Sequence, residues 1–407
     1  MTTLSLKQLT LHSLLTLAIC TPTLVHAAKR VTSSTLPTGE NVIAGTIESF
    51  NRSTPKNLTI TQSSDRAIIE WNAFDIGKKA TVNFIQPSQN AWTVNRVVSP
   101  GTDPTKILGK LNANGQVMVL DPNGVIFGNR SRIDVNGIIV STGDIADQDF
   151  MKGTALIAFT KGTGAKGIRS RIDLAGKITV GNSGIAAFVA PWVRNRGTIT
   201  ANLGKITLAA AENFTVDLYG DKLVELDTGV TTKNANINNR GTLNANGGTI
   251  ELSIGQAEHI VSSVINMTGV INAANIENKN GKIILSNPNT PDKRQRRNII
   301  RISKNKKTSL NADQIYIDGT TDSRKNRYAQ KQDVTNLVEG NPYPEKTTTL
   351  VNNTTPEIKN IDPTHRTKQI TKHYNQAIKT HDLDITITQY PRIASLNNIT
   401  PHAAYNE

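Results

Sequence analysis

The chain contains 407 residues, with 46 Lys and Arg against 32 Asp and Glu, a net charge of +14, one Cys and 4% aromatic residues. A single Cys excludes an internally disulfide-stabilised scaffold. No apolar run reaches the ~20 residues of a spanning helix, which excludes a helical membrane protein. Val, Ile and Leu recur throughout, which argues against a fully disordered chain.

Residues 1–27 have the pattern of a Sec signal peptide. Lys7 is the only formal charge, and the apolar stretch Leu9–Ile19 is too short to span a bilayer. The residues that end this segment fit a small-x-small cleavage site, so we expect cleavage between Ala27 and Ala28. The single Cys lies within this segment, and the mature chain would then contain none, which suits an oxidising compartment.

The body of the chain, from about residue 41 to residue 287, consists of short β-branched runs separated by Gly, Asn and Thr. Helical periodicity is nearly absent, and this pattern predicts strands joined by tight turns. The clearest predicted strands are Leu58–Thr61, Thr81–Ile85, Val117–Leu120, Ile138–Val140 and Lys282–Leu285.

Internal repeats indicate how these strands are arranged. Asn195–Ala201 recurs as Asn239–Ala245, 44 residues later, and Gly269–Ala273 is a third, partial copy. Stacking such units at about 4.8 Å would bury one continuous apolar column, so we predict an all-β parallel solenoid with roughly 20–25 residues per coil. A β-sandwich is the alternative, although sandwiches rarely repeat a motif in this way. The less repetitive segment Asn41–Phe84 is the predicted N-terminal cap, which would protect the first coil from edge pairing.

Clustered motifs in the first third of the chain make the pattern recognisable. Thr61–Trp71, which includes Asp65, Arg66 and Trp71, is followed by Asn95-Arg96, Leu111–Gln116 and Asp121–Gly128. These motifs resemble the filamentous-haemagglutinin N-terminal domain, the two-partner-secretion or haemagglutination-activity domain. The resemblance extends more loosely to about residue 286.

The resemblance implies a single-stranded, right-handed parallel β-helix of the pectin-lyase-like type. It also implies a Gram-negative exoprotein that crosses the periplasm and is exported by an outer-membrane transporter with periplasmic POTRA-type domains. Such a protein would act as an adhesin or haemagglutinin, either at the cell surface or released into the medium. Host or neighbouring-cell surface glycans or proteins are then candidate partners, and no nucleic acid is expected.

The Asn-Pro-Asn-Gly motif of the family maps onto Asp121, Pro122, Asn123 and Gly124, with Asp121 in place of the usual Asn. The second family motif, of the Asn-Pro-Asn-Leu type, has no clear counterpart. The turn also has an explanation of its own, because Pro presets φ, Asn and Gly accept positive φ, and Asp can cap the turn. Partner contact and a purely structural turn are therefore both open interpretations.

No catalytic constellation, metal site or cofactor site stands out, so we predict that the protein is not an enzyme. We interpret two loose acidic groups as solvated loops. They consist of Asp144, Asp147 and Asp149, and of Asp217, Asp221, Glu225 and Asp227. A carbohydrate-active β-helix enzyme is the alternative, and a groove with converging acids on one face would favour it.

The C-terminal part differs in composition. Eight basic residues fall within fifteen residues that contain no acid: Lys293, Arg294, Arg296, Arg297, Arg301, Lys304, Lys306 and Lys307. We expect one more strand at Gln314–Asp318 and an otherwise polar, largely disordered tail. A C-terminal toxin or haemolysin activity is a further alternative. The predicted organisation is thus a signal peptide (1–27), a capped secretion domain (28–150), a β-helix continuation (151–290) and a basic, largely irregular tail (291–407).

Overall fold

The structure is a computed structural model, and its described parts all lie in the first of two compact units, Met1–Pro344 and Glu345–Glu407. The described residues are 30–98, 101, 103–153, 156–162, 170–217, 224–226, 232, 235–255, 264–274, 281–287, 299–302 and 308–319. The predicted signal peptide, the cleavage residues Ala27 and Ala28, and the predicted tail beyond residue 319 lie outside them.

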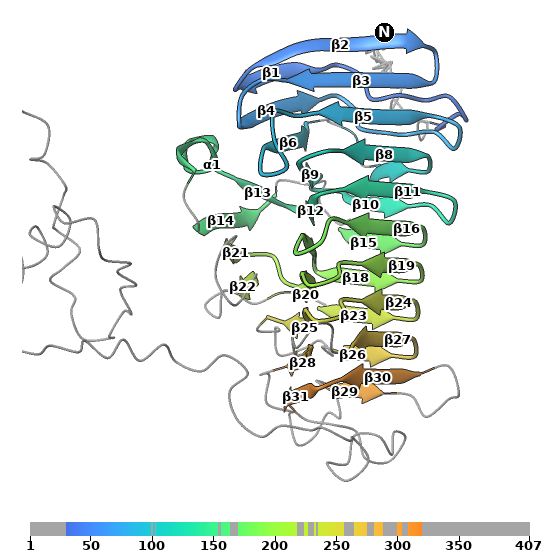
Figure 1. Cartoon of the computed structure of the whole chain (residues 1–407), viewed down its shortest axis with the longest axis vertical. Helices are drawn as coiled ribbons and strands as arrows, with labels where there is room; N and C mark the ends of the chain where they lie inside the picture. The colour runs from blue at the N-terminus through green and yellow to red at the C-terminus, as the bar shows by residue number, and fades with distance from the viewer. Residues whose placement is uncertain are drawn as a thin grey trace, which may run out of the picture. The chain divides into compact units, whose positions relative to one another are not determined.

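The strands form two ten-stranded sheets, one seven-stranded sheet and one four-stranded sheet (Figure 1). The first ten-stranded sheet contains, in spatial order, β1 (Asn41–Ala44), β4 (Arg66–Trp71), β6 (Trp92–Val97), β9 (Gln116–Leu120), β12 (Gly137–Ser141), β17 (Ile185–Val189), β20 (Lys205–Ala210), β25 (Thr249–Ile254), β28 (Lys282–Asn287) and β31 (Gln314–Gly319). The second contains β2 (Ile47–Thr54), β3 (Asn57–Gln62), β5 (Thr81–Ile85), β8 (Lys110–Ala113), β11 (Arg132–Val135), β16 (Lys177–Val180), β19 (Thr198–Thr200), β24 (Thr242–Asn244), β27 (Val270–Ala273) and β30 (Ser309–Ala312).

The seven-stranded sheet completes the wall of the solenoid. It contains β29 (Ile299–Ile302), β26 (Val264–Met267), β23 (Asn236–Asn239), β18 (Trp192–Asn195), β15 (Arg171–Leu174), β10 (Gly124–Phe127) and β7 (Thr105–Ile107). Neighbouring strands of this sheet are parallel, and the strands of the two large sheets are parallel from β3 and β4 onward. This pairing confirms the parallel β-helix and excludes the β-sandwich, whose sheets are antiparallel.

The repeated segments stack on one another in register. Thr198 lies opposite Thr242, and Thr242 lies opposite Val270, so the three copies occupy the same position in successive coils. Coil length varies, because Lys110 and its partner Arg132 are 22 residues apart, whereas Arg132 and Lys177 are 45 residues apart. The longer coil carries an excursion that leaves the solenoid between two of its strands.

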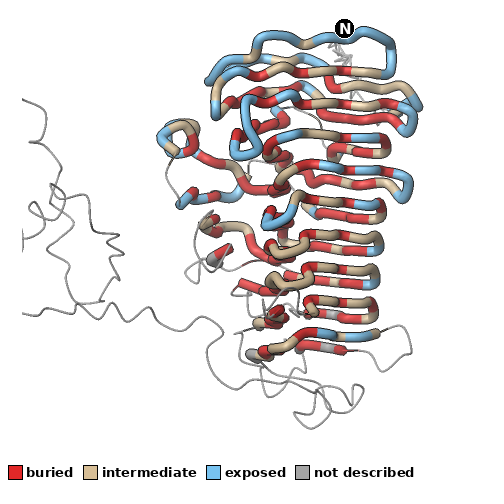
Figure 2. Tube along the Cα trace, viewed as in Figure 1, coloured by how far each residue is buried: buried red, intermediate tan, exposed pale blue. Residues whose placement is uncertain are grey.

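Two excursions build a small antiparallel sheet on the outside of the solenoid. This sheet contains β13 (Gly143–Ile145), β14 (Leu156–Lys161), β21 (Phe214–Asp217) and β22 (Val224–Leu226), and helix α1 (Asp147–Lys152) lies between its first two strands. Together they cover the outer face of the first large sheet from β4 to β20. Outward-facing residues such as Ile68, Met118 and Ile139 are consequently as buried as the interior of the coils (Figure 2). The near-continuous apolar runs of strands such as β12 and β17 are the sequence signal of this second core, because strands buried on both faces lack polar alternation.

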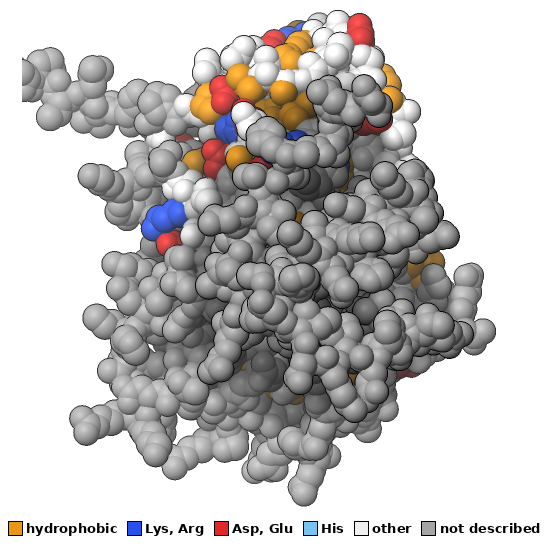
Figure 3. Space-filling view, turned by 90° about the vertical axis from the view of Figure 1, so that its left-hand side faces the viewer, with side chains coloured by type: hydrophobic (Ala, Val, Ile, Leu, Met, Phe, Trp, Pro, Cys, Tyr) orange, Lys and Arg blue, Asp and Glu red, His pale blue; other side chains and the backbone are white. Residues whose placement is uncertain are grey.

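Antiparallel strands close the N-terminal end. β1 pairs with β4, and β2 pairs with β3, before parallel stacking begins. Beneath them, the ring of Trp71 lies edge-on to Phe50 and Phe74, with centroid distances of 5.9 and 5.4 Å. This is the expected cap, since the unpaired backbone edge of the first coil is covered. Hydrophobic side chains are nevertheless exposed at this end of the molecule (Figure 3).

Parallel stacking continues beyond the predicted boundary at residue 290. β29, β30 and β31 each pair with the strand of the preceding coil, and the predicted strand Gln314–Asp318 is part of β31. Ile300 and Ile302, which interrupt the basic run, are buried in the core. Except for the backbone of Arg301 in β29, the basic run lies outside the described residues. The only helix in the described part, α1, has six residues, and no helix there is long and apolar enough to span a membrane.

Candidate functional site

The Asp121–Gly124 turn joins β9 to β10, as the sequence predicts. The Asp121 carboxylate is buried and accepts hydrogen bonds from the backbone N–H of Asn123 (2.8 Å), and from the backbone N–H (2.8 Å) and hydroxyl (2.7 Å) of Thr105. Gly124 has φ +109°, a conformation that side chains rarely adopt. Asp121 therefore caps its own turn and also ties β10 to β7 in the coil above.

Burial raises the pKa of Asp121 from 3.8 to about 6, while the hydrogen bonds from Thr105 and Asn123 oppose this shift. The negative charge of Asp75 makes a smaller contribution in the same direction as burial. The side chains of Asp121 and Asn123 are both buried in the folded chain, and the hydrogen bond between the two residues closes the turn. Of the motif, Pro122 is the residue that is partly exposed.

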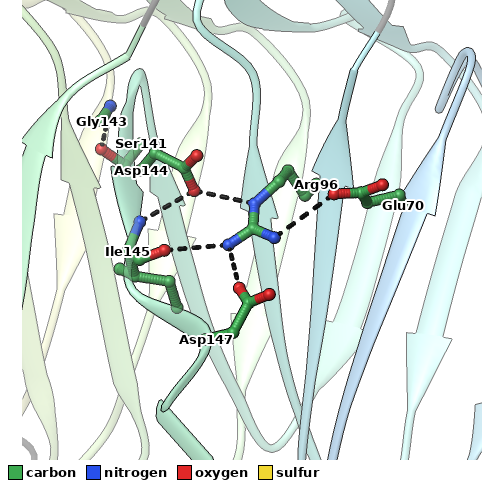
Figure 4. A network of polar contacts seen from close by, with 7 residues as sticks. All are labelled: Glu70, Arg96, Ser141, Gly143, Asp144, Ile145 and Asp147. Carbon is green, nitrogen blue, oxygen red and sulfur yellow. Dashed lines mark hydrogen bonds and ion pairs between the residues drawn. The ribbon is translucent and has the colours of Figure 1, made fainter. Parts of the chain in front are cut away.

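Arg96, on β6, is the centre of a second polar site (Figure 4). Its Nε donates to Asp144 (2.8 Å), and its Nη2 donates to Asp147 (2.6 Å) and to the carbonyl oxygen of Ile145 (2.9 Å). Glu70 on β4 lies 3.6 Å from its Nη1. The guanidinium side chain is only 10% exposed, so this site joins two solenoid strands to the start of the excursion.

Electrostatics favour the ionised arginine at this site. Burial lowers the pKa of Arg96, but hydrogen bonds to Asp147 and the nearby charge of Asp144 outweigh it, and the pKa lies above its ordinary value. The two aspartates remain 43% and 39% exposed, so water shares in their solvation. The site is thus a buried cation held by half-exposed carboxylates.

Arg66, on β4, contacts helix α1 of the excursion. It donates to the carbonyl oxygen of Phe150 (2.9 Å), and its guanidinium lies 5.2 Å from the centroid of the Phe150 ring, within range of a cation–π contact. Phe150 itself is fully buried against the solenoid. Half-buried Arg66 therefore connects the solenoid to helix α1 through a hydrogen bond and a ring contact. Asp65 contributes its backbone carbonyl, which accepts from the N–H of Trp92.

Trp71 and Asn95 connect three successive coils within the core. The indole N–H of Trp71 donates to the side-chain oxygen of Asn95 (3.0 Å), and the amide of Asn95 donates to the carbonyl oxygen of Met118 (3.1 Å). Both side chains are fully buried. All of the predicted cap residues, Asp65, Arg66, Trp71, Asn95 and Arg96, therefore lie on β4 and β6 or in the turn that leads into β4.

The sequence-based interpretation of the first acidic group was wrong for two of its members. Asp144 and Asp147 are the partners of Arg96, and Asp149 forms an exposed pair with Lys152 (3.7 Å). A single charged residue, Arg96, in a strand of otherwise uncharged residues was the signal that could have predicted acidic partners, because a buried charge needs one. Of the second group, Asp221 and Asp227 lie outside the described residues. Within the described part, no group of three or more His, Cys, Asp or Glu could hold a metal ion.

Comparison with protein families decides what kind of domain this is. The family model of the TPS secretion domain, where TPS denotes two-partner secretion, matches residues 28–302. The chain belongs to the TPS secretion domain family. This TPS secretion domain begins at Ala28, the residue after the predicted cleavage position. The match supports the resemblance at this level, and the narrower assignment to filamentous haemagglutinin stays a prediction.

Two curated relatives of this TPS secretion domain are both described as a heme/hemopexin-binding protein of Haemophilus influenzae. One is 27% identical over 300 residues, covering 69% of this chain and 31% of the relative. The other, from strain ATCC 51907 / DSM 11121 / KW20 / Rd, is 31% identical over 256 residues, covering 62% of this chain and 27% of the relative. The chain thus matches less than a third of the length of either relative.

Among solved structures, the secretion domain of HMW1 from Haemophilus influenzae aligns with a TM-score of 0.49 and 22% sequence identity. The alignment covers 70% of this chain and 72% of that chain.

Proposed function

We propose that this protein is an exoprotein of a Gram-negative bacterium that is exported by two-partner secretion and acts as an adhesin, of the filamentous-haemagglutinin type, at or outside the cell surface. The observation that carries the proposal is the match of the TPS secretion domain to residues 28–302. A signal-like segment precedes the match, and a β-helix occupies it, so an export signal and an export domain follow each other along the chain.

The export partner in this proposal is an outer-membrane transporter with periplasmic POTRA-type domains. The buried state of Asp121 and Asn123 suggests when such a partner would read the turn motif. Both side chains are accessible only before β9 and β10 have stacked, so recognition would precede folding. Folding outside the cell would then bury them and help to retain the exported chain.

Deletion of the transporter tests the export route. In a strain that lacks it, the protein should accumulate in the periplasm with its signal peptide removed after Ala27, while the wild-type strain releases it or displays it on the surface. N-terminal sequencing of the periplasmic form and immunodetection in the medium provide the measurements. Unchanged secretion in the deletion strain would contradict the proposal, and restoring the transporter on a plasmid is the matched control.

We propose that the protein is not an enzyme. A carbohydrate-active β-helix would need acidic side chains that converge on one face. In the described part, three candidate acids instead form ion pairs with arginines. Asp144 and Asp147 hold Arg96, and Asp173 is bound by Arg194 and Arg196. The remaining alternative, a C-terminal toxin or haemolysin activity, concerns residues outside the described part, and an erythrocyte lysis assay with the secreted chain tests it.

A second candidate function is binding of heme or of a heme-carrying protein. The two curated relatives carry the name heme/hemopexin-binding protein, and their similarity covers most of this secretion domain. Titration of the purified chain with heme, followed by the Soret absorbance, and pull-down with hemopexin would test this candidate. Adhesion to host cells without either interaction would favour the adhesin instead.

A further inference from the structure

Three exposed basic side chains form one row on the second large sheet. Arg132 on β11 lies opposite Lys110 on β8 and, on its other side, opposite Lys177 on β16. The three strands are neighbours in the sheet (Figure 1), and all three side chains are exposed. Neighbouring strands are about 4.8 Å apart, so the row places three cations along roughly 10 Å in a straight line. None of the three forms an ion pair with an acidic residue of the described part of the chain.

The surroundings of the row add to its positive charge. Exposed Lys78, Lys79 and Arg130 lie in the turns that lead into β5 and β11, at the same corner of the solenoid. Among the outward-facing residues of the described parallel strands of this sheet, Asp134 is the only acid. Beside the row of cations runs a second row, in which Asp134 lies between the amide of Asn112 and the hydroxyl of Thr179. Like-charged side chains in direct register repel one another, which disfavours the row unless an anion binds there.

We propose that this row, Lys110, Arg132 and Lys177, binds a linear sulfated polysaccharide. The inference gives the proposed adhesin a ligand class, and it depends on that function for its setting, because only an exported chain meets such glycans. Sulfate groups would pair with the three cations, and glycan hydroxyls would bond to the neighbouring amides and hydroxyls. The chain would lie along the solenoid axis, across β8, β11 and β16.

The shape of the site favours a thin polyanion over other anionic partners. The row is one residue wide, whereas duplex DNA and a lipid surface present charge over a broad area. The outward positions of β5, β8, β11 and β16 also carry no aromatic side chain on which bases of a single strand could stack. A single file of three cations, flanked by neutral polar groups and by the one carboxylate of Asp134, matches one sulfated sugar chain.

The test uses the purified mature chain and size-defined heparin as the probe. The row variant K110Q/R132Q/K177Q should lose at least about tenfold in heparin affinity, because each exposed charge pair contributes modestly and three act together. The slope of affinity against salt concentration should also fall. A scattered variant with the same loss of charge, K152Q/K161Q/R240Q, should change affinity less than about twofold. Circular dichroism confirms that each variant folds.

Further experiments distinguish heparin binding at the row from heparin binding elsewhere on the chain. A variant with all eight basic residues of Lys293–Lys307 replaced by Gln should keep row-dependent binding, and hyaluronan, which lacks sulfate, should bind poorly. The proposal is overturned if the row variant binds heparin like wild type, if binding depends only on the Lys293–Lys307 run, or if duplex DNA binds to the row more tightly than heparin. Secretion is measured in cells and heparin binding on purified protein, so failure of one is distinguishable from failure of the other.

Discussion

The first coils of the solenoid and the coils after residue 195 are held in register in different ways. In the first coils, side chains that occur once connect the strands, as Trp71 does through Asn95 and Arg96 does through Asp144. In the later coils, like residues stack on like. The side-chain amide of Asn195 donates to the side-chain oxygen of Asn239 in the next coil (2.8 Å), and Thr198 lies opposite Thr242.

This difference shows what each region contributes. Nearly identical coils can stack equally well after slipping by one whole coil, so repetition alone does not define where the stack begins. Contacts that occur once do define it, because Arg96 has its acidic partners at one place only. We infer that the first coils set the register and that the later coils extend it.

The largest expected effect is on the Arg96 site. Arg96→Ala should lower the free energy of unfolding by about 2–4 kcal/mol, since it removes a buried charge that satisfies two carboxylates and a carbonyl oxygen. The aspartates are half-exposed, which keeps the loss below that of a fully buried pair. Urea denaturation gives the magnitude, and limited proteolysis should show cleavage between β13 and β14 before the solenoid unfolds.

Arg96→Lys is the matched variant, because it keeps the charge but cannot reach both aspartates in the same geometry. Arg96→Lys should recover less than half of the unfolding free energy that Arg96→Ala loses. If Arg96→Ala were as stable as wild type, or if proteolysis began in the repeated coils, the first coils would not depend on this contact.

The repeated coils should be most sensitive at their glycine corner. A methyl group at Gly204 would collide with the backbone of Gly184 in the coil above, so Gly204→Ala should cost about 2–3 kcal/mol. At the corresponding corner of the first coils, a methyl at Gly137 would meet the end of the Gln116 side chain, 2.6 Å from its Oε1. This side chain can move, and Gly137→Ala should cost less than about 1 kcal/mol. If urea denaturation gave equal losses of unfolding free energy for Gly204→Ala and Gly137→Ala, the proposed difference between the two regions would be contradicted.

Asp121 should give the first coils a pH dependence. The carboxyl titrates near 3.8 when exposed and at about 6 in the folded chain, so between these values the folded state binds more protons than the unfolded state. Its contribution to stability is therefore present at low pH and falls by about 2–3 kcal/mol as the pH rises through 6. Asp121→Asn should remove this slope, measured by urea denaturation at pH 4 to 7. If the slope of stability against pH were unchanged in Asp121→Asn, another titrating group would be responsible for it.

The parallel β-helix could be predicted because its determinants are local. The 44-residue repeat and strands such as Thr81–Ile85 follow from the spacing of apolar residues and glycines, and the structure has them at these positions. The turn at Asp121 could also be predicted, since an Asx cap acts within two residues.

The partners within the site could not be predicted in the same way. Asp144 lies 48 residues from Arg96, and Phe150 lies 84 residues from Arg66, across an excursion whose path has no periodic signal. Acidic residues in a polar loop resemble solvated ones until that path is known. Thr105 was missed as a partner of Asp121 for the same reason, because only the coil geometry brings β7 beside β10.

The smallest expected effect concerns the cap, at the outermost edge of the first coils. Arg52 holds Glu40 through two hydrogen bonds (2.7 and 2.9 Å), which lower the pKa of Glu40 below its ordinary value. Because the pair is partly exposed, Arg52→Gln should cost only about 0.5–1 kcal/mol.

The lowered pKa of Glu40 means that the contribution of this pair to stability is present at neutral pH and is lost on acidification, opposite in sign to that of Asp121. Glu40→Gln should cost as much, and the double variant no more than either. Hydrogen exchange should then rise in β1 and β2 alone, whereas faster exchange in β20 or β25 would mean that the cap also stabilises the repeated coils.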